Sequence, residues 1–306
     1  MSKPQVVFFG SGPVAAKSLE MLVANFDVIA IVTKPKPEHH HGSFPVIDVA
    51  DVHSLPVHFV RNKHQLSELI ATNPFPAEVA ILIDFGIIVG QDAIDYFPKG
   101  IINSHFSLLP EWRGADPISF AILSGQRKTG VSLMLLVEAM DEGPLLSQSG
   151  LELDINETTI SLTEKLILES DRALRVIIPM WLNGETLERP QEEVTIADNK
   201  IPSYSRKLNK TDGELDFTKP ADVLEREIRA FIEWPKSHTK LAEIDVIITQ
   251  VSVADYTGKI GSIKIKDKQL IIPCSEKALV IERLKPAGKA DMTAEAFIAG
   301  YGSRLD

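Results

Sequence analysis

Gln5-Val6-Val7-Phe8-Phe9-Gly10-Ser11-Gly12-Pro13 stands near the start of the chain. The apolar, β-favouring residues of its first half are typical of a buried strand, and the glycines that follow are typical of a tight turn. Proline is well tolerated at the first position of a helix, so Pro13 predicts a helix that runs to about Asn25. A second apolar strand is expected at residues 26–33. A strand, a helix and a strand in this order predict a parallel sheet.

The same alternation of short apolar runs and helical patterns continues through the first half of the chain. Further strands are predicted at 56–60, 78–83, 101–105 and 130–137, and helices at 46–53, 63–72 and 114–123. Leu162, Leu166, Ala173 and Ile177 mark one face of a long helix, which Pro179 is expected to kink or end. The fold class predicted for this half is α/β, a Rossmann-like domain with a mostly parallel sheet.

The second half of the chain has a different organisation. Hydrophobic periodicity fades between residues 185 and 210, which predicts an interdomain linker. One helix, at about 220–232, and a series of short β-rich runs follow, and these favour a small β-barrel of the oligonucleotide-binding type. The expected domains are therefore residues 1–189, a linker at 190–206, and a C-terminal barrel at 207–306.

Composition and charge limit the classes of function. The 306 residues are 44% hydrophobic and 24% charged, which is typical of a folded globular protein. Neither a bilayer-spanning apolar run nor a signal-peptide pattern is visible, so we expect a cytoplasmic protein without a membrane partner. The net charge of −10 argues against nucleic-acid binding over the whole surface, but residues 1–200 carry −11 and the remainder +1. A polyanionic partner would therefore bind the second half.

Polar residues gather at the end of the strand predicted at 101–105, at the sheet edge where ligands bind in open α/β folds. Asn103 and His105 point the same way because side chains alternate along a strand, and Asp141 follows 36 residues later. An amide donor, an imidazole and a carboxylate are the groups needed for acyl transfer to an amine. No Ser or Cys has a nucleophile-elbow context, which favours direct transfer. Spacing alone leaves a second interpretation open, in which Asn103 and His105 satisfy a strand end and Asp141 caps a turn.

Sequence strings around these residues resemble a known family. Ser107-Leu108-Leu109-Pro110, then Trp112-Arg113-Gly114-Ala115 and Pro117, with Asn-x-His before and Asp-x-Gly at 141–143, resemble the formyltransferases that use 10-formyltetrahydrofolate. Asp84-Phe85-Gly86-Ile87-Ile88 resembles the loop that lines the folate pocket in that family. Arg229-Ala230-Phe231, Trp234-Pro235 and residues 284–289 resemble the C-terminal domain of the branch that acts on tRNA.

The resemblance implies a function and a set of site residues. Asn103, His105 and Asp141 would be catalytic, and the folate would contact Ser107, Leu108, Leu109, Pro110, Phe85, Gly86 and Ile88. The enzyme would move the formyl group of 10-formyltetrahydrofolate to the amino group of methionyl-tRNA, without a metal and as a monomer. One alternative is a formyltransferase that acts on an amino-sugar nucleotide. Another is a non-catalytic tRNA- or folate-binding protein, which should have lost Asn103, His105 or Asp141.

Two other motifs are weak. Gly10-x-Gly12-x-x-Ala15 fits a dinucleotide-binding fingerprint, but the acidic residue expected after the second strand is absent, so a tight turn is the preferred interpretation. His39-His40-His41 could suggest a metal site. Three adjacent imidazoles cannot all point at one ion, and no partner stands at ligand spacing, so a solvated loop is preferred.

Basic residues of the second half are the candidates for contact with tRNA. In the resembled family the loop after the second strand is long and basic, whereas here only Lys34 and Lys36 remain. Arg206, Lys207 and Lys210 stand at the end of the predicted linker. Lys264, Lys266 and Lys268 alternate along one predicted strand, and would either contact phosphate or form a solubilising face.

Overall fold

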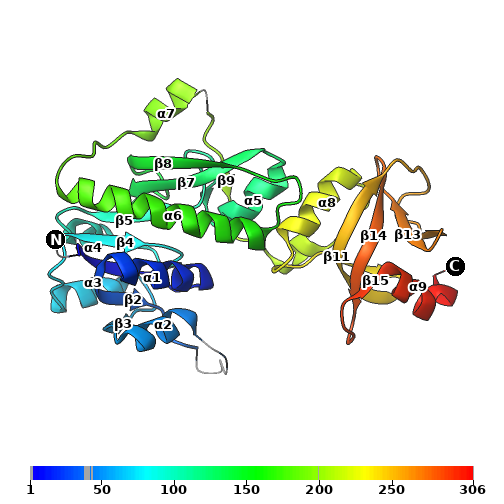
Figure 1. Ribbon diagram of the computed structural model, residues 1–306, viewed down its shortest axis with the longest axis horizontal. Coiled ribbons are helices and arrows are strands. Elements are labelled where there is room, and N and C mark those ends of the chain that lie inside the picture. The colour runs from blue at the N-terminus through cyan, green and yellow to red at the C-terminus, as the bar shows by residue number, and fades with distance from the viewer. Residues whose placement is uncertain (1–2, 38–41, 43, 199, 306) are drawn as a thin grey trace. The chain divides into compact units, whose positions relative to one another are not determined.

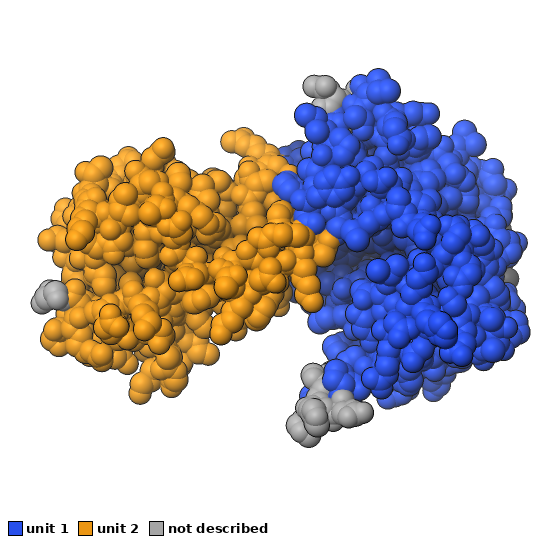
Figure 2. Space-filling view, turned by 180° about the vertical axis from the view of Figure 1, so that it is seen from behind, with its two compact units in different colours: residues 1–114, 128–152, 163–205 blue, residues 115–127, 153–162, 206–306 orange. Residues whose placement is uncertain are grey.

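The computed structural model describes residues 3–37, 42, 44–198 and 200–305 (Figure 1). The chain forms two compact units, coloured separately in Figure 2. The first unit consists of residues 1–114, 128–152 and 163–205, and the second of residues 115–127, 153–162 and 206–306. Two short segments from the predicted first domain therefore belong to the second unit. No described helix is both long and apolar enough to cross a bilayer.

The first unit is built on a seven-stranded sheet in which five neighbouring strands are parallel. In spatial order the strands are β3 (Val57–Phe59), β2 (Asp27–Thr33), β1 (Gln5–Phe9), β4 (Val79–Leu82), β5 (Ile101–His105), β7 (Lys128–Leu135) and β8 (Leu145–Glu152). Strands β7 and β8 are antiparallel to their neighbours. The predicted α/β class with a mostly parallel sheet is thus confirmed.

Helices connect the parallel strands, as the alternation of patterns predicts. They are α1 (Pro13–Asn25), α2 (Pro45–His53), α3 (Lys63–Thr72) and α4 (Gln91–Tyr96), and α6 (Thr159–Leu182) follows β8. Pro13 occupies the first helical turn of α1, where its missing N–H costs no hydrogen bond. The sheet core contains Phe9, which packs edge-on against Phe85 and Phe97 with ring centroids 5.4 and 6.1 Å apart.

The register of the parallel strands brings their carboxyl ends together. Phe9 of β1 pairs with Leu82 of β4, and Leu82 pairs with Asn103 of β5. The loops that follow β1 and β4 therefore begin beside Asn103. This is the sheet edge that binds ligands in open α/β folds.

The second unit contains an antiparallel sheet. Its order is β10 (His238–Leu241), β11 (Ile244–Ala254), β14 (Ala278–Pro286), β13 (Gln269–Pro273) and β12 (Lys264–Lys266), and β15 (Met292–Thr293) also pairs with β14. Among the described residues β10 and β12 do not pair with each other, so the sheet does not close into the expected barrel. These edge strands have four and three residues. Strands this short offer few backbone groups for a closing ladder.

Helices complete the second unit. They are α5 (Pro117–Ser124), α8 (Ala221–Ala230) and α9 (Ala294–Tyr301), with the 3-10 turns η1 (Lys210–Gly213) and η2 (Gly302–Arg304). One face of α8 and one face of α9 pack on the sheet, and their buried members include Leu224, Ile228 and Phe297. The buried thiol of Cys274 belongs to the same core.

Several individual elements differ from the prediction. The predicted linker at 190–206 contains a helix, α7 (Gln191–Asp198), and a short strand, β9 (Tyr204–Ser205), which pairs with β6 (Arg113–Gly114). The edge strand β8 is missing from the prediction. Helix α6 continues three residues past Pro179, so this proline does not end it. Helix α5 begins at Pro117 rather than at residue 114.

Candidate active site

Three polar side chains predicted from the sequence lie together at the end of β5. Asn103 and His105 are each 7% exposed, and both reach Asp141. The Asn103 amide donates a hydrogen bond of 3.3 Å to Asp141 Oδ1, and His105 Nδ1 lies 3.8 Å from Asp141 Oδ2. The alternation of side chains along the strand therefore has the predicted result, because Asn103 and His105 face the same carboxylate.

The Asp141 carboxylate is held by the chain around it. Its Oδ2 accepts a hydrogen bond of 2.7 Å from the backbone N–H of Gly114. Asp141 itself has a φ of 54°, in the left-handed region that is uncommon for residues other than glycine. Such a conformation persists only where the surroundings fix it, and it often marks a functional site.

The tautomer of His105 follows from one contact. Its Nε2 lies 2.9 Å from the carbonyl oxygen of Trp112. A carbonyl oxygen can only accept, so Nε2 carries a proton and donates. In a neutral imidazole Nδ1 is then unprotonated, and it is the atom that faces Asp141. A second proton can bind only at Nδ1, next to that carboxylate.

The loop 107–110 is fixed by a fully bonded serine. Ser132 Oγ donates to the carbonyl oxygen of Ser107 at 2.7 Å and accepts from the N–H of Leu109 at 3.0 Å. The Gln148 amide donates to Ser132 Oγ and to the Leu109 carbonyl oxygen. Ser107 Oγ donates to the carbonyl oxygen of Glu111. This loop therefore has a defined shape beside the three polar residues.

The predicted folate-contacting residues differ in what they expose. Phe85, Ser107 and Leu109 are at most 1% exposed as whole residues, so neither their side chains nor their backbone atoms are open to a ligand in this structure. Leu108 and Pro110 are also buried. Ile88 is 72% exposed on the loop after β4, and Gly86 has a φ of 64°.

The glycines after β1 serve packing. A Cβ atom on Gly10 would lie 2.6 Å from a ring carbon of Phe8 and 2.7 Å from Ala15 Cβ, so the glycine lets α1 approach the strand. Next to Gly12 lies the carboxylate of Asp84, 1.8 Å from where a Cβ would be. A carboxylate at the start of α1 would repel a pyrophosphate, which supports the tight-turn interpretation over dinucleotide binding. His39, His40 and His41 lie outside the described residues.

The basic residues predicted to contact tRNA are exposed, but two of them are engaged by acidic partners. Arg206 donates two hydrogen bonds to Asp212, which hold the pKa of that carboxyl down at about 2. Lys268 Nζ lies 2.6 Å from Glu295. Lys268 is also not on a strand with Lys264 and Lys266, because β12 ends at Lys266 and Lys268 follows in a turn with a φ of 64°. The predicted alternation of three lysines on one strand is therefore wrong. Lys207 and Lys210 are exposed.

Sequence reasoning missed the residues that hold the site together. These are Gln191, Ser132, Gln148 and the N–H group of Gly114. Arg113 forms an ion pair, since its Nη1 lies 2.8 Å from Glu142 Oε1. An arginine has five N–H donors, and a buried one needs an acceptor for each of them. This requirement is the one feature of the sequence that could have predicted a partner such as Gln191.

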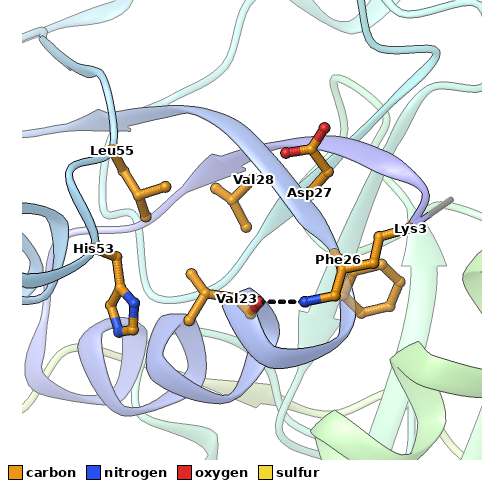
Figure 3. Close-up of a pocket in the computed structure, with 7 residues that line it drawn as sticks. All are labelled: Lys3, Val23, Phe26, Asp27, Val28, His53 and Leu55. Atoms are coloured by element: carbon orange, nitrogen blue, oxygen red, sulfur yellow. Dashed lines mark hydrogen bonds between the residues drawn. The ribbon is translucent and has the colours of Figure 1, made fainter.

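The pocket shown in Figure 3 lies elsewhere on the first unit. Its lining comes from the start of β2, the end of α1 and the residues around them: Lys3, Val23, Phe26, Asp27, Val28, His53 and Leu55. Lys3 Nζ donates to the Val23 carbonyl oxygen at 3.1 Å (Figure 3). None of the predicted site residues belongs to this lining, which stands at the amino-terminal edge of the sheet.

Comparison with known proteins identifies the family. Residues 5–177 match the formyl transferase family, and residues 207–302 match the formyl transferase C-terminal domain. The chain belongs to the formyl transferase family.

Relatives with a more specific name cover almost the whole chain. Methionyl-tRNA formyltransferase of Myxococcus xanthus is 34% identical over 98% of this chain and 96% of its own length. The protein of the same name from Ectopseudomonas mendocina is also 34% identical, over 99% of this chain and 95% of its own length. The crystal structure of an N-formyltransferase from Helicobacter canadensis, in complex with folinic acid and dTDP-3-aminofucose, has the same fold. It matches with a TM-score of 0.68 and 17% identity over 92% of this chain and 99% of that one.

Proposed function

We propose that the protein transfers the formyl group of 10-formyltetrahydrofolate to the amino group of methionyl-tRNA. The observation that carries the chemistry is the cluster of Asn103, His105 and Asp141 at the carboxyl edge of the parallel sheet. The tRNA substrate is supported by the two methionyl-tRNA formyltransferases that match this chain from end to end. A folate donor is supported by the family and by the folinic acid bound to the neighbour of similar fold.

The reaction exchanges one carbon–nitrogen bond for another. The amine nitrogen of methionyl-tRNA forms a bond to the formyl carbon, the bond from that carbon to N10 of the folate breaks, and the proton lost by the amine ends on N10. The products are N-formylmethionyl-tRNA and tetrahydrofolate. The protein must therefore stabilise charge on the formyl oxygen and transfer one proton.

Asn103 is suited to the first task. An amide has two hydrogens, and one of them is donated to Asp141. The other can be donated to the formyl oxygen as negative charge develops there. The contact with Asp141 fixes the rotation of the amide, so this donor is oriented before the substrate arrives.

His105 and Asp141 are suited to the second task. The Nε2 proton of His105 is held by Trp112, so a proton from the amine can be accepted only at Nδ1 or on the Asp141 carboxylate. A positive charge on the imidazole is stabilised by that carboxylate at 3.8 Å. We infer that this pair receives the amine proton and returns it to the leaving nitrogen.

The loop residues are suited to the folate. Its backbone groups at 107–110 are fixed by Ser132 and Gln148, and Ile88 offers an exposed apolar surface on the loop that starts beside Asn103. A flat heterocycle is bound in proteins mainly by apolar contact, which Ile88 can provide next to the rigid 107–110 loop. We propose the contacts of Phe85, Gly86, Ser107, Leu108, Leu109 and Pro110 with the folate on this basis.

We further propose that the C-terminal domain, residues 207–306, binds the tRNA through its exposed lysines. Formylated initiator tRNA is used where ribosomes work, so we propose an enzyme of the cytoplasm, and we propose a monomer because the family resemblance implies one. Residues 1–189 would carry the reacting groups, in the same division that the sequence predicts.

One assay separates this function from its alternatives. The protein is incubated with 10-formyltetrahydrofolate and either methionyl-tRNA or UDP- and dTDP-linked amino sugars, and formylated amine is measured by mass spectrometry. Uncharged tRNA is the matched control, because it lacks the amino group. We expect formylation of methionyl-tRNA only. Formylation of a sugar alone would replace the proposal by the amino-sugar alternative, and binding of tRNA or folate without any turnover would leave a non-catalytic protein.

A further inference from the structure

Gln191 is buried within the first unit and uses all of its hydrogen-bonding capacity on two other segments. It is the first residue of α7, and it is 1% exposed. Its Oε1 accepts from Arg113 Nε at 3.1 Å and from Arg113 Nη2 at 2.7 Å. Its Nε2 donates to the carbonyl oxygens of Asp141 at 2.8 Å and Gly143 at 2.9 Å. Two acceptor positions and two hydrogens are what an amide has to offer.

The two segments that Gln191 joins are those that orient the reacting pair. Arg113 stands between Trp112, whose carbonyl oxygen holds His105, and Gly114, whose N–H holds Asp141. The turn at 141–143 carries Asp141 itself, with its φ of 54°. The side chain of Gln191 therefore connects the 112–114 segment to the 141–143 turn.

We propose that Gln191 is a positioning residue for formyl transfer, which sets the place of the Asp141 carboxylate relative to His105. It lies in residues 178–206, outside both parts of the chain that match the formyl transferase family. The activity assay of the Gln191 variants rests on the proposed function, whereas the effect of Gln191 on the structure around His105 can be measured without turnover.

The chemistry of the position requires an amide. Glutamate has the same shape but no hydrogen to donate, and its carboxylate would face the carbonyl oxygens of Asp141 and Gly143. Methionine has a similar volume but leaves the Arg113 guanidinium, 7% exposed, without two of its acceptor contacts. Arg113 keeps its ion pair with Glu142, but buried N–H groups without an acceptor are unfavourable. In both variants the turn at Asp141 loses its two donors.

The test compares Gln191→Glu and Gln191→Met with Glu192→Gln, a matched control at the next, exposed residue of the same helix. We expect kcat for formyl transfer to fall by about 10- to 100-fold in both Gln191 variants with KM changed less than about threefold, because small misplacements of reacting groups are costly and substrate contacts remain. The pH profile of kcat should shift as well, since Asp141 would no longer hold its place beside His105. The control should stay within about twofold of the unchanged protein.

A second readout does not depend on the substrate. Nitrogen NMR of the histidine-labelled protein, with the His105 signal assigned from a His105→Gln variant, reports the protonation of each ring nitrogen. The Gln191 variants should change the His105 signals while the other described histidines stay unaltered, even if the enzyme formylates a different amine. If the folded variants keep the His105 signals and the pH profile, and lose activity only in proportion to unfolded protein, Gln191 is merely structural and the proposal is overturned.

Discussion

The Nε2 atom of His105 donates its proton to the carbonyl oxygen of Trp112 over 2.9 Å. This contact assigns different tasks to the two ring nitrogens. Nε2 is an anchor, because its proton is used within the protein, and Nδ1 is the only ring atom that can gain or lose a proton during a reaction. Asp141 lies on the Nδ1 side, so the carboxylate and the free nitrogen act as one unit.

Asp141→Asn should remove the proton-accepting function of this unit and the acceptor of the Asn103 amide, because the new side chain has only one oxygen. The asparagine oxygen can still accept the Gly114 N–H, so the turn should persist. An amide cannot take a proton near neutral pH, and we expect kcat to fall by about 100-fold or more. The measurement is initial-rate formylation of methionyl-tRNA, with thermal unfolding as the check on folding. A folded variant with a near-normal rate would contradict the role of Asp141.

Asn103→Ala should remove the donor to the formyl oxygen. Loss of one such donor typically lowers kcat by about 100- to 1000-fold. Ser104→Ala is the matched control on the same strand, because the Ser104 hydroxyl points away from the site and bonds Ser170 Oγ at 2.6 Å on α6. The control should lose stability and keep its rate per folded molecule. Equal losses of rate in the two variants would mean that both substitutions disturb β5 as a whole. They would contradict the role of Asn103 as donor to the formyl oxygen.

How well the sequence predicts this molecule depends on the range of the interactions involved. Strand β1, helix α1 and strand β5 follow from local pattern, because a continuous apolar run and a proline at a helix start act within a few residues. The common direction of Asn103 and His105 also follows, because they alternate on one strand, whereas Asp141 joins them only through the family resemblance.

Other features depend on distant partners and give little local signal. Strand β8 contains Ser, Gln and Gly at a sheet edge, where one face needs no apolar residues. Among the described side chains of α7 only Gln191 and Val194 are buried, too few to produce a helical hydrophobic pattern. The importance of Gln191 comes from residues 48 to 78 positions away in sequence.

The two glycines after β1 should differ in their tolerance of a side chain. A methyl group on Gly10 would meet Phe8 and Ala15, which are both fully buried, so Gly10→Ala should lower the free energy of unfolding by about 1–3 kcal/mol. A methyl group on Gly12 would meet the carboxylate end of Asp84, an exposed side chain outside the packed interior. Gly12→Ala should therefore cost less. Urea unfolding of the two variants checks this order, and the reverse order would refute the packing explanation.

Asp171 should make stability depend on pH in a defined direction. It is 6% exposed on α6, its Oδ1 has no hydrogen-bond partner among the described residues, and burial raises its pKa above 3.8. The folded state therefore holds the Asp171 proton more tightly than the unfolded state does. As the pH rises from 3.8 through the folded pKa, this residue loses its favourable contribution to folding.

The comparison that isolates this effect is the unchanged protein against Asp171→Asn. Asparagine does not titrate. The free energy of unfolding of the variant should therefore increase relative to that of the unchanged protein as the pH is raised from about 4 to about 7. Arg175 Nε, 3.0 Å from Asp171 Oδ2, opposes the rise in pKa, so Arg175→Gln should enlarge the difference. A difference that is constant or shrinks with rising pH would show that the carboxyl is not penalised by burial.

Contact of the second unit with tRNA should depend on Lys264 and Lys266 more than on Lys268. Lys264 and Lys266 are exposed on β12 and have no ion pair within the described part of the chain, whereas Lys268 is 2.6 Å from Glu295. Release of counterions from the tRNA makes the affinity fall with salt, by a slope of about 0.7–0.9 for each phosphate contact. If both lysines contact phosphate, the double variant Lys264→Gln, Lys266→Gln should bind tRNA more weakly at low salt and show a slope smaller by about 1.4–1.8. Lys268→Gln is the matched control and should change both quantities less, because its charge is already balanced. Filter binding across a series of salt concentrations measures affinity and slope together, and a double variant equal to the unchanged protein in both would leave β12 as a solubilising face.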